Sequence, residues 1–220
     1  WPGLFEKIPN VVGKIIKYLT KHQRIDLLVN NNKSIDTTRK YLKKIGCNIS
    51  NIKFHKLNTD RLWLRDSGPI FLVNKKIRKK SMLDFKFNAW SKYKNFRNDN
   101  KINDYISRYL NIESILPKKV NSNKYKRVVM EGGAFDSNGS GSILLTRECL
   151  LSSKQKRNIG FKKIDYENLF SEYLNAKNFI WLNKGIVGDD THGHIDDIAR
   201  FVSKRTIMIA VEKNRSDKNY

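Results

Sequence analysis

Apolar residues recur along the chain at two spacings, which predict helices and strands in mixed order. Four segments carry apolar residues at helical spacing, namely residues 10–20, 36–45, 104–110 and 165–174. Eight shorter runs are typical of strands, namely residues 25–29, 52–57, 70–73, 83–87, 127–130, 142–146, 179–182 and 206–211. This order predicts an α/β or α+β fold built from small βαβ-like modules. No linker rich in Gly, Pro or Ser divides the chain, so we expect a single domain.

The composition is that of a folded chain with an apolar core. The 220 residues are 39% hydrophobic and 11% aromatic. Such a chain can bury enough apolar surface to fold, which excludes a largely disordered protein, a collagen or a coiled coil. At about 150 residues per domain, the length also favours one domain.

The chain is strongly basic, with 44 Lys and Arg against 21 Asp and Glu and a net charge of +23. A nucleic-acid-binding module is one interpretation, because dense positive charge releases counterions from phosphates. The basic residues nevertheless occur in short scattered groups, such as Arg78–Lys80 and Lys154–Arg157. Since Asn and Ile are also abundant, we favour compositional drift at solvated surface positions over a dedicated nucleic-acid surface.

The two cysteines, Cys47 and Cys149, are too few for a disulfide framework, so a reducing compartment is expected. No uninterrupted apolar run reaches the ~18 residues of a membrane helix. The first apolar stretch is broken by charged residues and is not typical of a signal peptide. These features together predict a cytoplasmic protein without a membrane partner.

Residues 59–69, TDRLWLRDSGP, place a Trp, two Arg and two Asp just before a Gly-Pro turn and a predicted strand. Functional side chains often lie in loops at strand ends. An Asp beside a Trp suits a flat cation, because the carboxylate accepts paired hydrogen bonds while the ring covers one face. A surface salt bridge and a core Trp explain the same residues, and this cluster alone favours that simpler interpretation.

Two further clusters are rich in groups that can do chemistry. Glu131 ends a predicted strand and precedes Gly132 and Gly133, which let a ligand approach the backbone closely, although an ordinary turn is the alternative. Residues 188–197, GDDTHGHIDD, hold two of the four histidines and four carboxylates. One His can shuttle protons near neutral pH while one Asp anchors a cation. A solvated polar loop stays open as the simpler interpretation.

The same segment allows a metal-dependent hydrolase with His192, His194 and Asp196 as ligands. A His-x-His run followed by Asp is similar to the ligand run of the metallo-β-lactamase fold, which needs further histidines downstream. The chain has no histidine after His194, and Asp197 stands where that run would have His. Metal binding is therefore the lesser alternative.

Taken together and in order, the clusters resemble the agmatine deiminase and bacterial-type peptidylarginine deiminase family. The resemblance rests on DRLWLRDSGPIF (60–71), FNAW (87–90), EGGAFDSNGSGSILLTRECLL (131–151) and DDTHGHIDDIARFV (189–202). It runs from about residue 20 to the end, and it is specific because WxRDxGP, EGG and GHxD must occur together in this order. It implies the pentein fold, a pseudo-fivefold α/β propeller that is incomplete here, with residues 1–220 as a single partial deiminase domain.

The resemblance also implies a reaction and roles for individual residues. The enzymes of this family hydrolyse a guanidinium group to a ureido group and ammonia, through a Cys nucleophile and a covalent amidino intermediate. By resemblance, Asp66 and Asp196 anchor the guanidinium and Trp63 forms a wall of the pocket. Glu131 is the pocket carboxylate of the agmatine-type enzymes, and His194 is the general acid–base. No metal ion or organic cofactor is implied.

One part of the family pattern does not occur in the chain, the Gly-rich motif with the nucleophilic Cys that follows the GHxD segment. Cys47 lies at a predicted helix end, and Cys149 lies in a segment that matches a non-catalytic part of the family. Both are therefore expected to be small buried residues. We expect the chain to be a fragment, truncated at its C-terminal end and also at its N-terminal end, that lacks turnover by itself.

The expected substrate is agmatine, converted to N-carbamoylputrescine and ammonia in putrescine synthesis, with peptidyl arginine as the close alternative. The expected partner is thus a small cationic guanidine. Nucleic acid is not an expected partner, and self-association into a homo-oligomer stays open.

Overall fold

The computed structural model describes residues 5–121 and 124–220. The chain divides into two compact units, Trp1–Asp60 and Arg61–Tyr220. That both belong to one deiminase domain stays a prediction. Within the described ranges, no helix combines the length and the apolar character needed to cross a membrane.

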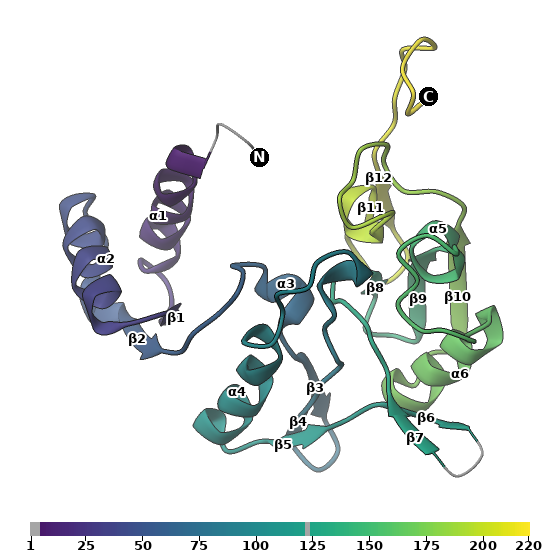
Figure 1. Ribbon diagram of the computed structural model, residues 1–220, viewed down its shortest axis with the longest axis horizontal. Coiled ribbons are helices and arrows are strands. Elements are labelled where there is room, and N and C mark those ends of the chain that lie inside the picture. Colours follow the sequence, from purple (N-terminus) through teal and green to yellow (C-terminus); the bar gives the residue numbers. More distant parts are fainter. Residues whose placement is uncertain (1–4, 122–123) are drawn as a thin grey trace. The chain divides into compact units, whose positions relative to one another are not determined.

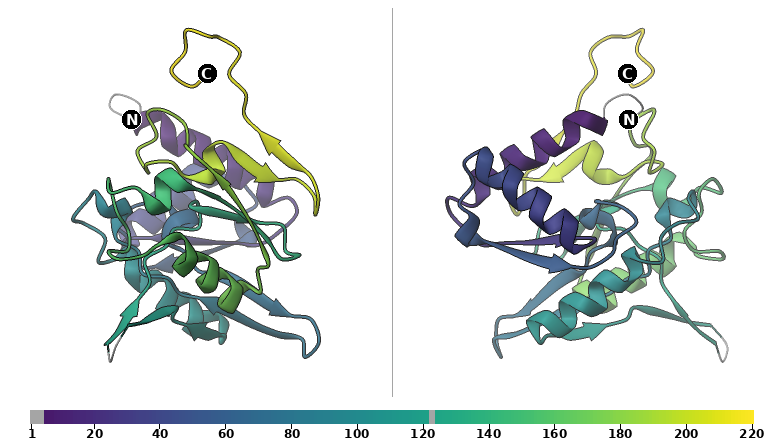
Figure 2. Two further views of the ribbon diagram at one scale, coloured as in Figure 1. Left: turned by 90° about the vertical axis from the view of Figure 1, so that its right-hand side faces the viewer. Right: turned by 60° about the vertical axis from the view of Figure 1, so that its left-hand side comes forward.

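The first unit is a βαβ module preceded by a helix (Figure 1). Its elements are a short 3₁₀ turn η1 (Phe5–Lys7), α1 (Ile8–Leu19), β1 (Ile25–Val29), α2 (Asn32–Lys44), η2 (Ile49–Asn51) and β2 (Ile52–Lys56). The two strands are parallel, with Ile25 opposite Ile52, and both helices lie on the same side of them (Figure 2, right). The core of this unit consists of Ile16, Leu42, Cys47 and Ile52. Cys47 is thus buried, as expected.

Helix α2 begins four residues earlier than the sequence predicts. Its predicted start was Asp36, but the side-chain oxygen of Asn31 accepts a hydrogen bond from the Ser34 backbone N–H at 2.9 Å. Asn in this capping position satisfies a free N–H of the first turn, so the helix starts at Asn32. Gly46, at φ +81°, follows the helix, and its left-handed conformation is typical of a helix end.

The second unit begins with the one-turn helix α3 (Leu64–Ser67) and a three-stranded sheet. Strands β3 (Ile70–Asn74) and β4 (Lys79–Leu83) form an antiparallel hairpin, and β5 (Glu113–Ile115) pairs with β4 in parallel. A parallel pair needs a crossover connection. This crossover contains η3 (Ala89–Ser91), η4 (Asp99–Lys101) and α4 (Ile102–Leu110).

A second three-stranded sheet has the order β10-β9-β8. Strand β8 (Phe135–Ser137) is antiparallel to β9 (Ser142–Thr146), and β10 (Asn178–Leu182) is parallel to it. The crossover between β9 and β10 contains α5 (Arg147–Leu151) and α6 (Lys163–Leu174). Two antiparallel pairs complete the unit, β6 (Lys118–Asn121) with β7 (Lys124–Arg127) and β11 (Ala199–Phe201) with β12 (Ile207–Ile209).

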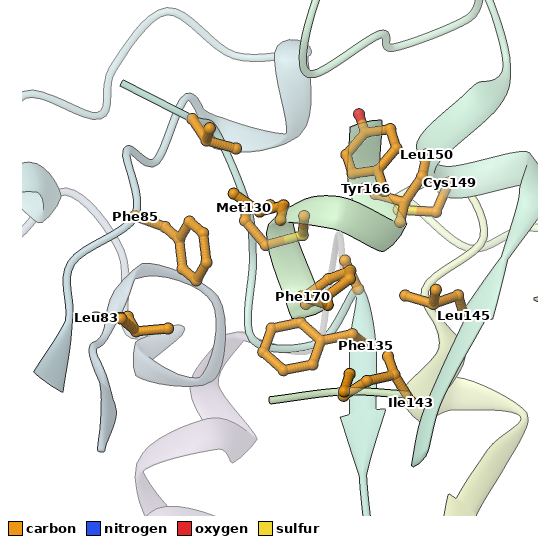
Figure 3. Close-up of a cluster of buried hydrophobic side chains, with 14 residues drawn as sticks. Leu83, Phe85, Met130, Phe135, Ile143, Leu145, Cys149, Leu150, Tyr166 and Phe170 are labelled. Atoms are coloured by element: carbon orange, nitrogen blue, oxygen red, sulfur yellow. The ribbon is translucent and has the colours of Figure 1, made fainter. Parts of the chain in front are cut away.

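The main apolar core lies where α6 packs against the β10-β9-β8 sheet (Figure 3). Tyr166 and Phe170 of α6 are both fully buried, and the Phe170 ring lies 5.0 Å from that of Phe135 in β8. Cys149 belongs to the same cluster and is 1% exposed, which confirms that it is buried. The core therefore supports β9 and the start of α5, the two elements that lie next to the candidate site.

The predicted strand 83–87 is wrong beyond its first residue, because β4 ends at Leu83. Leu83, Phe85 and Phe87 are buried, as the alternation indicates. After Leu83 the backbone forms an isolated bridge, between Lys86 and Val129, and the predicted strand 127–130 likewise lies mostly beyond β7. Six further α-helices and strands of the described residues, α3, β5, β6, β8, α5 and β11, were not predicted. They have three to five residues, too few to show a helical or strand period clearly.

Candidate active site

Four predicted site residues meet at the ring of His194. Asp66 comes from α3, Glu131 from the segment between β7 and β8, and Asp196 from η5 (Ile195–Asp197), which His194 directly precedes. His194 Nδ1 lies 3.7 Å from Asp66 Oδ1 and 3.8 Å from Asp196 Oδ1. His194 Nε2 lies 3.8 Å from Glu131 Oε2. Three sequence clusters thus converge on one point, and the roles of their residues stay predictions.

Asp66 is buried, and both of its carboxylate oxygens accept hydrogen bonds. The Gly133 backbone N–H donates to Oδ1 at 3.2 Å, and the Trp90 indole N–H donates to Oδ2 at 3.1 Å. Burial raises the pKa of Asp66 to about 6, although the charge of His194 opposes this shift. The carboxyl group is therefore held in one orientation and changes its charge just below neutral pH.

Trp90 contacts Asp66, although the sequence predicts no role for this tryptophan. It lies in η3, where Ala89, Trp90 and Ser91 have φ between 51° and 58°. Residues other than glycine rarely adopt this left-handed conformation, and it is concentrated at functional sites. The turn brings the indole N–H to Asp66, and the Arg61 guanidinium lies 5.5 Å from the Trp90 ring centroid. The FNAW motif marked this segment, but nothing in its residue types indicates a hydrogen bond to Asp66.

Glu131 is paired inside the protein with Arg157. Both side chains are completely buried, and Arg157 Nε donates to both Glu131 oxygens at 3.1 and 3.3 Å. Burial alone would raise the pKa of Glu131, but the charges of Arg157 and then His194 outweigh burial and lower it. The interpretation of Lys154–Arg157 as a solvated basic group is therefore wrong for Arg157. A short basic group does not reveal which of its members turns inward to a buried carboxylate.

The loop before His194 is held by side-chain hydrogen bonds. Asp189 accepts from the backbone N–H groups of Gly193 at 2.7 Å and His194 at 3.0 Å. The Thr146 hydroxyl donates to the Gly193 carbonyl and accepts from the Cys149 N–H at 3.1 Å, so the junction of β9 and α5 anchors the same loop. Gly193 has φ +89°, a conformation that favours glycine. The backbone that carries His194 is thus held in place by Asp189 and by the buried Thr146.

Opposing influences act on the charge of His194, whose side chain is 2% exposed. Burial lowers the pKa of His194, but the Glu131 carboxylate and then Asp66 outweigh burial and raise it. Nε2 is buried and has no hydrogen-bond partner among the described residues, so Glu131 acts on it as a nearby charge. The fold therefore favours an imidazolium that can donate a proton.

The space beside Gly133 is enclosed by charged groups. A Cβ at this residue would collide with His194 Nδ1, and it would lie 2.7 Å from Asp66 Oδ1 and 2.9 Å from Asp196 Oδ2. Gly133 therefore packs directly against the three groups, and a larger residue would push them apart. The second Gly of the EGG motif thus lets Asp66, Asp196 and His194 gather in one cluster, whose two carboxylates can accept hydrogen bonds from a flat cation.

Asp196 and Trp63 form the more exposed part of the predicted site. Asp196 Oδ2 lies 3.4 Å from Arg65 Nε and 3.9 Å from Arg200 Nη1, and both arginine side chains are nearly half exposed. Exposed ion pairs of this kind are weak, so a ligand can compete with them. Trp63 directly precedes α3 and is 40% exposed. Its role as a pocket wall stays a prediction.

The two histidines of the alternative metal site do not come together as ligands. Within the part of the chain that the structure describes, the ligand atoms that lie within 4.8 Å of one another belong to Glu131, Cys149 and His194. Glu131 is already paired with Arg157, and burial raises the pKa of the Cys149 thiol. The Glu131 carboxylate is thus occupied by the Arg157 guanidinium, and the Cys149 thiol keeps its proton.

His192 faces a different set of groups. Its Nε2 lies 3.2 Å from Ser152 Oγ, and burial lowers its pKa. It lines a pocket of about 370 Å³ whose charged residues are Lys92, Glu148, Lys154, Lys184, Asp189 and Asp190. This pocket adjoins the loop that carries His194 and presents charges of both signs.

Comparison with known proteins agrees with this geometry. The model of the Porphyromonas-type peptidyl-arginine deiminase family matches residues 1–220. The chain belongs to this family. The match includes the segments that contain Asp66, Glu131, His194 and Asp196.

One curated relative of the chain is a Legionella pneumophila protein that is provisionally named agmatine deiminase. It is 31% identical over 216 residues, which make up 98% of the chain and 57% of the relative. A Latilactobacillus sakei protein with the same provisional name is 34% identical over 177 residues, 77% of the chain and 45% of the relative. The chain thus spans about half the length of the curated relatives it matches.

Solved structures confirm the predicted pentein-type α/β fold. A variant of the C. jejuni agmatine deiminase with substrate bound matches with a TM-score of 0.82 and 28% identity, over 100% of this chain and 60% of that one. A structure provisionally described as a peptidyl-arginine deiminase matches with a TM-score of 0.80 and 29% identity, over 100% and 61%. These shares agree with the expectation that the propeller is incomplete in residues 1–220.

The raised pKa of Asp66 predicts how the stability of the chain changes with pH. Asp66 keeps its proton up to about pH 6 in the fold and only to about pH 3.8 when unfolded. Between these values the folded state binds more protons, so the free energy of unfolding should fall as pH rises, by up to about 3 kcal/mol. Urea unfolding at pH 4 and pH 7 measures this fall. In Asp66→Asn the fall should be smaller, and equal falls in both proteins would contradict the raised pKa.

Proposed function

We propose that the protein containing this chain hydrolyses a guanidinium group to a ureido group and ammonia. The observation that carries this proposal is the convergence of Asp66, Asp196 and Glu131 on the ring of His194, at 3.7 to 3.8 Å. A guanidinium is flat, cationic and rich in N–H donors, so two carboxylates at this spacing can hold it and orient its carbon. Membership of the deiminase family supports the same class of reaction.

The geometry suits a reaction in two halves. A thiolate adds to the guanidinium carbon, and one C–N bond breaks as the leaving nitrogen takes a proton from His194 and departs as ammonia. This leaves a covalent amidino intermediate on sulfur. Water then gives a proton to His194 and adds to the same carbon, and the C–S bond breaks to release the ureido product and the thiolate. The raised pKa of His194 favours the protonated form that the first half needs.

We infer that the thiolate comes from a Cys outside residues 1–220. Cys149 lies close to His194, but it is 1% exposed, and burial raises the pKa of its thiol. Cys47 is also buried, with a raised thiol pKa, in the core of the first unit. A buried thiol with a raised pKa is a poor nucleophile. The relatives are long enough to hold such a Cys, because this chain matches only 57% of the first of them.

Agmatine is the proposed substrate, with N-carbamoylputrescine and ammonia as products and putrescine synthesis as the purpose. The provisional names of the curated relatives and the substrate-bound C. jejuni structure favour agmatine. The description of the family favours peptidyl arginine as the second candidate. Both substrates carry the same guanidinium, so Asp66 and Asp196 can anchor either one.

Ammonia release tests the proposed function. A polypeptide that extends this chain beyond Tyr220 should release ammonia faster from agmatine than from an arginine-containing peptide, and residues 1–220 alone should release none. His194→Gln should abolish release by the extended polypeptide, whereas the control His22→Gln, at an exposed histidine, should not. Release by residues 1–220 alone would contradict an external nucleophile. Release that persists in His194→Gln would contradict the site.

A further inference from the structure

Arg157 is a cation in the interior of the site that no step of the proposed reaction uses. Its side chain is fully buried, and all three of its nitrogens donate hydrogen bonds. Nε donates to both Glu131 oxygens, Nη1 donates to the Gln155 carbonyl at 2.9 Å, and Nη2 donates to the Thr191 carbonyl. A guanidinium bonded through all of its nitrogens is held in a single orientation.

The segment around Arg157 joins the motifs that form the site. Arg157 itself connects Glu131 of the EGG motif to Thr191, three residues before His194. The Gln155 side chain donates to the carbonyl of Trp90 in the FNAW motif and to that of Asp190, at 3.2 Å each. Hydrogen bonds from residues 155–157 thus connect the three motifs to one another.

We propose that Arg157 is a positioning residue, a built-in counter-charge that fixes Glu131 beside His194 and balances the carboxylates around the imidazole. The proposal rests on the proposed function, in which His194 must both give up a proton and take one back. Arg157 acts through Glu131, whose Oε2 lies 3.8 Å from His194 Nε2. It therefore has no need to touch the substrate.

The charges around His194 show why a counter-charge is needed. The ionisable groups nearest to its ring come from several segments, and they are Asp66, Glu131, Cys149, Asp196 and, behind Glu131, Arg157. Three of these groups are carboxylates, which stabilise the imidazolium and hinder release of its proton. Burial lowers the pKa of His194. The carboxylates of Glu131 and Asp66 raise this pKa more strongly, and the charge of Arg157 opposes the carboxylates.

Titration of His194 in residues 1–220, followed by NMR of the imidazole, tests the proposal without any ligand. In Arg157→Gln the midpoint should move up by about one pH unit, because the carboxylates lose their counter-charge. Arg157→Lys keeps the charge and should leave the midpoint close to that of the unmodified chain. The matched control Lys156→Gln removes the neighbouring positive charge and should leave the midpoint unchanged. In the extended polypeptide, the pH profile of ammonia release should move in the same direction as the midpoint.

A folded Arg157→Gln variant with an unchanged midpoint would overturn the proposal, as would an equal shift in Lys156→Gln. If Arg157→Gln does not fold, Arg157→Lys decides the question. An unchanged midpoint in Arg157→Lys supports the counter-charge, and an upward shift of about one unit overturns it, because the charge is still present. The titration does not depend on turnover. Failure of the proposed function would therefore appear separately, as absent ammonia release with the titration behaviour intact.

Discussion

Asp66→Asn is expected to lower kcat/KM for agmatine by about 30- to 5000-fold in the extended polypeptide. The substitution keeps the shape of the side chain but removes the charge that lies 3.7 Å from His194 Nδ1. Loss of one partner of a buried charge pair costs about 2–5 kcal/mol, which corresponds to that range. In the variant, the amide NH₂ group also faces the N–H of either Gly133 or Trp90. Both of these donors are hydrogen-bonded to the Asp66 carboxylate in the unmodified protein. Steady-state ammonia release measures the effect.

Two observations separate this effect from unfolding. The asparagine variant should stay folded at pH 7, because removing a charge that burial penalises offsets the loss of one hydrogen-bond acceptor. Asp104→Asn is the matched control, since Asp104 is an exposed residue of α4 whose ion pair with Arg108 lies on the surface. It should leave kcat/KM nearly unchanged. A folded Asp66→Asn variant with more than a tenth of the activity would place the guanidinium elsewhere.

Gly133→Ala is expected to have an effect of similar size from the addition of one methyl group. The methyl would lie 2.4 to 2.9 Å from atoms of His194, Asp66 and Asp196, so these side chains would have to move. Since a displacement of about 1 Å at a reacting centre can cost about 100-fold in rate, kcat/KM should fall by at least about that factor. Gly133 is not among the glycines with positive φ, so alanine is compatible with its backbone and the strain falls on the displaced side chains.

Binding of agmatine, measured by calorimetry on the extended polypeptide, distinguishes the reason for this loss. If the displaced carboxylates no longer hold the guanidinium, binding and turnover should weaken together, and the thermal unfolding midpoint should also fall because the site is overpacked. Ser140→Ala, at an exposed position of the turn between β8 and β9, is the control and should change none of these quantities. A Gly133→Ala variant that binds agmatine normally would show that substrate binding does not depend on the positions of Asp66 and Asp196.

The longer elements of the fold could be predicted from the sequence, because they repeat their period often enough to be recognised. Helix α6 and strands β1, β9 and β10 lie within a few residues of their predicted places. Helix α2 was predicted with a late start, since the Asn31 cap depends on one local hydrogen bond. The short strands β5 and β8 exist because other strands pair with them, β4 in one sheet and β9 in the other. Pairing of this kind leaves little trace in three residues.

The sequence by itself determined the family and the chemical character of the site, because WLRD, EGG and GHID carry the carboxylates and the imidazole in a specific order. Only the tertiary structure decided which groups support them. It placed Arg157, one of a basic sequence group, against the buried Glu131, brought the Trp90 indole to Asp66, and packed Gly133 against Asp66, Asp196 and His194. The physical reason is that burial, hydrogen-bond partners and shifted pKa values depend on segments that meet only in the fold. The same residue types, read along the chain, are compatible with a solvated surface.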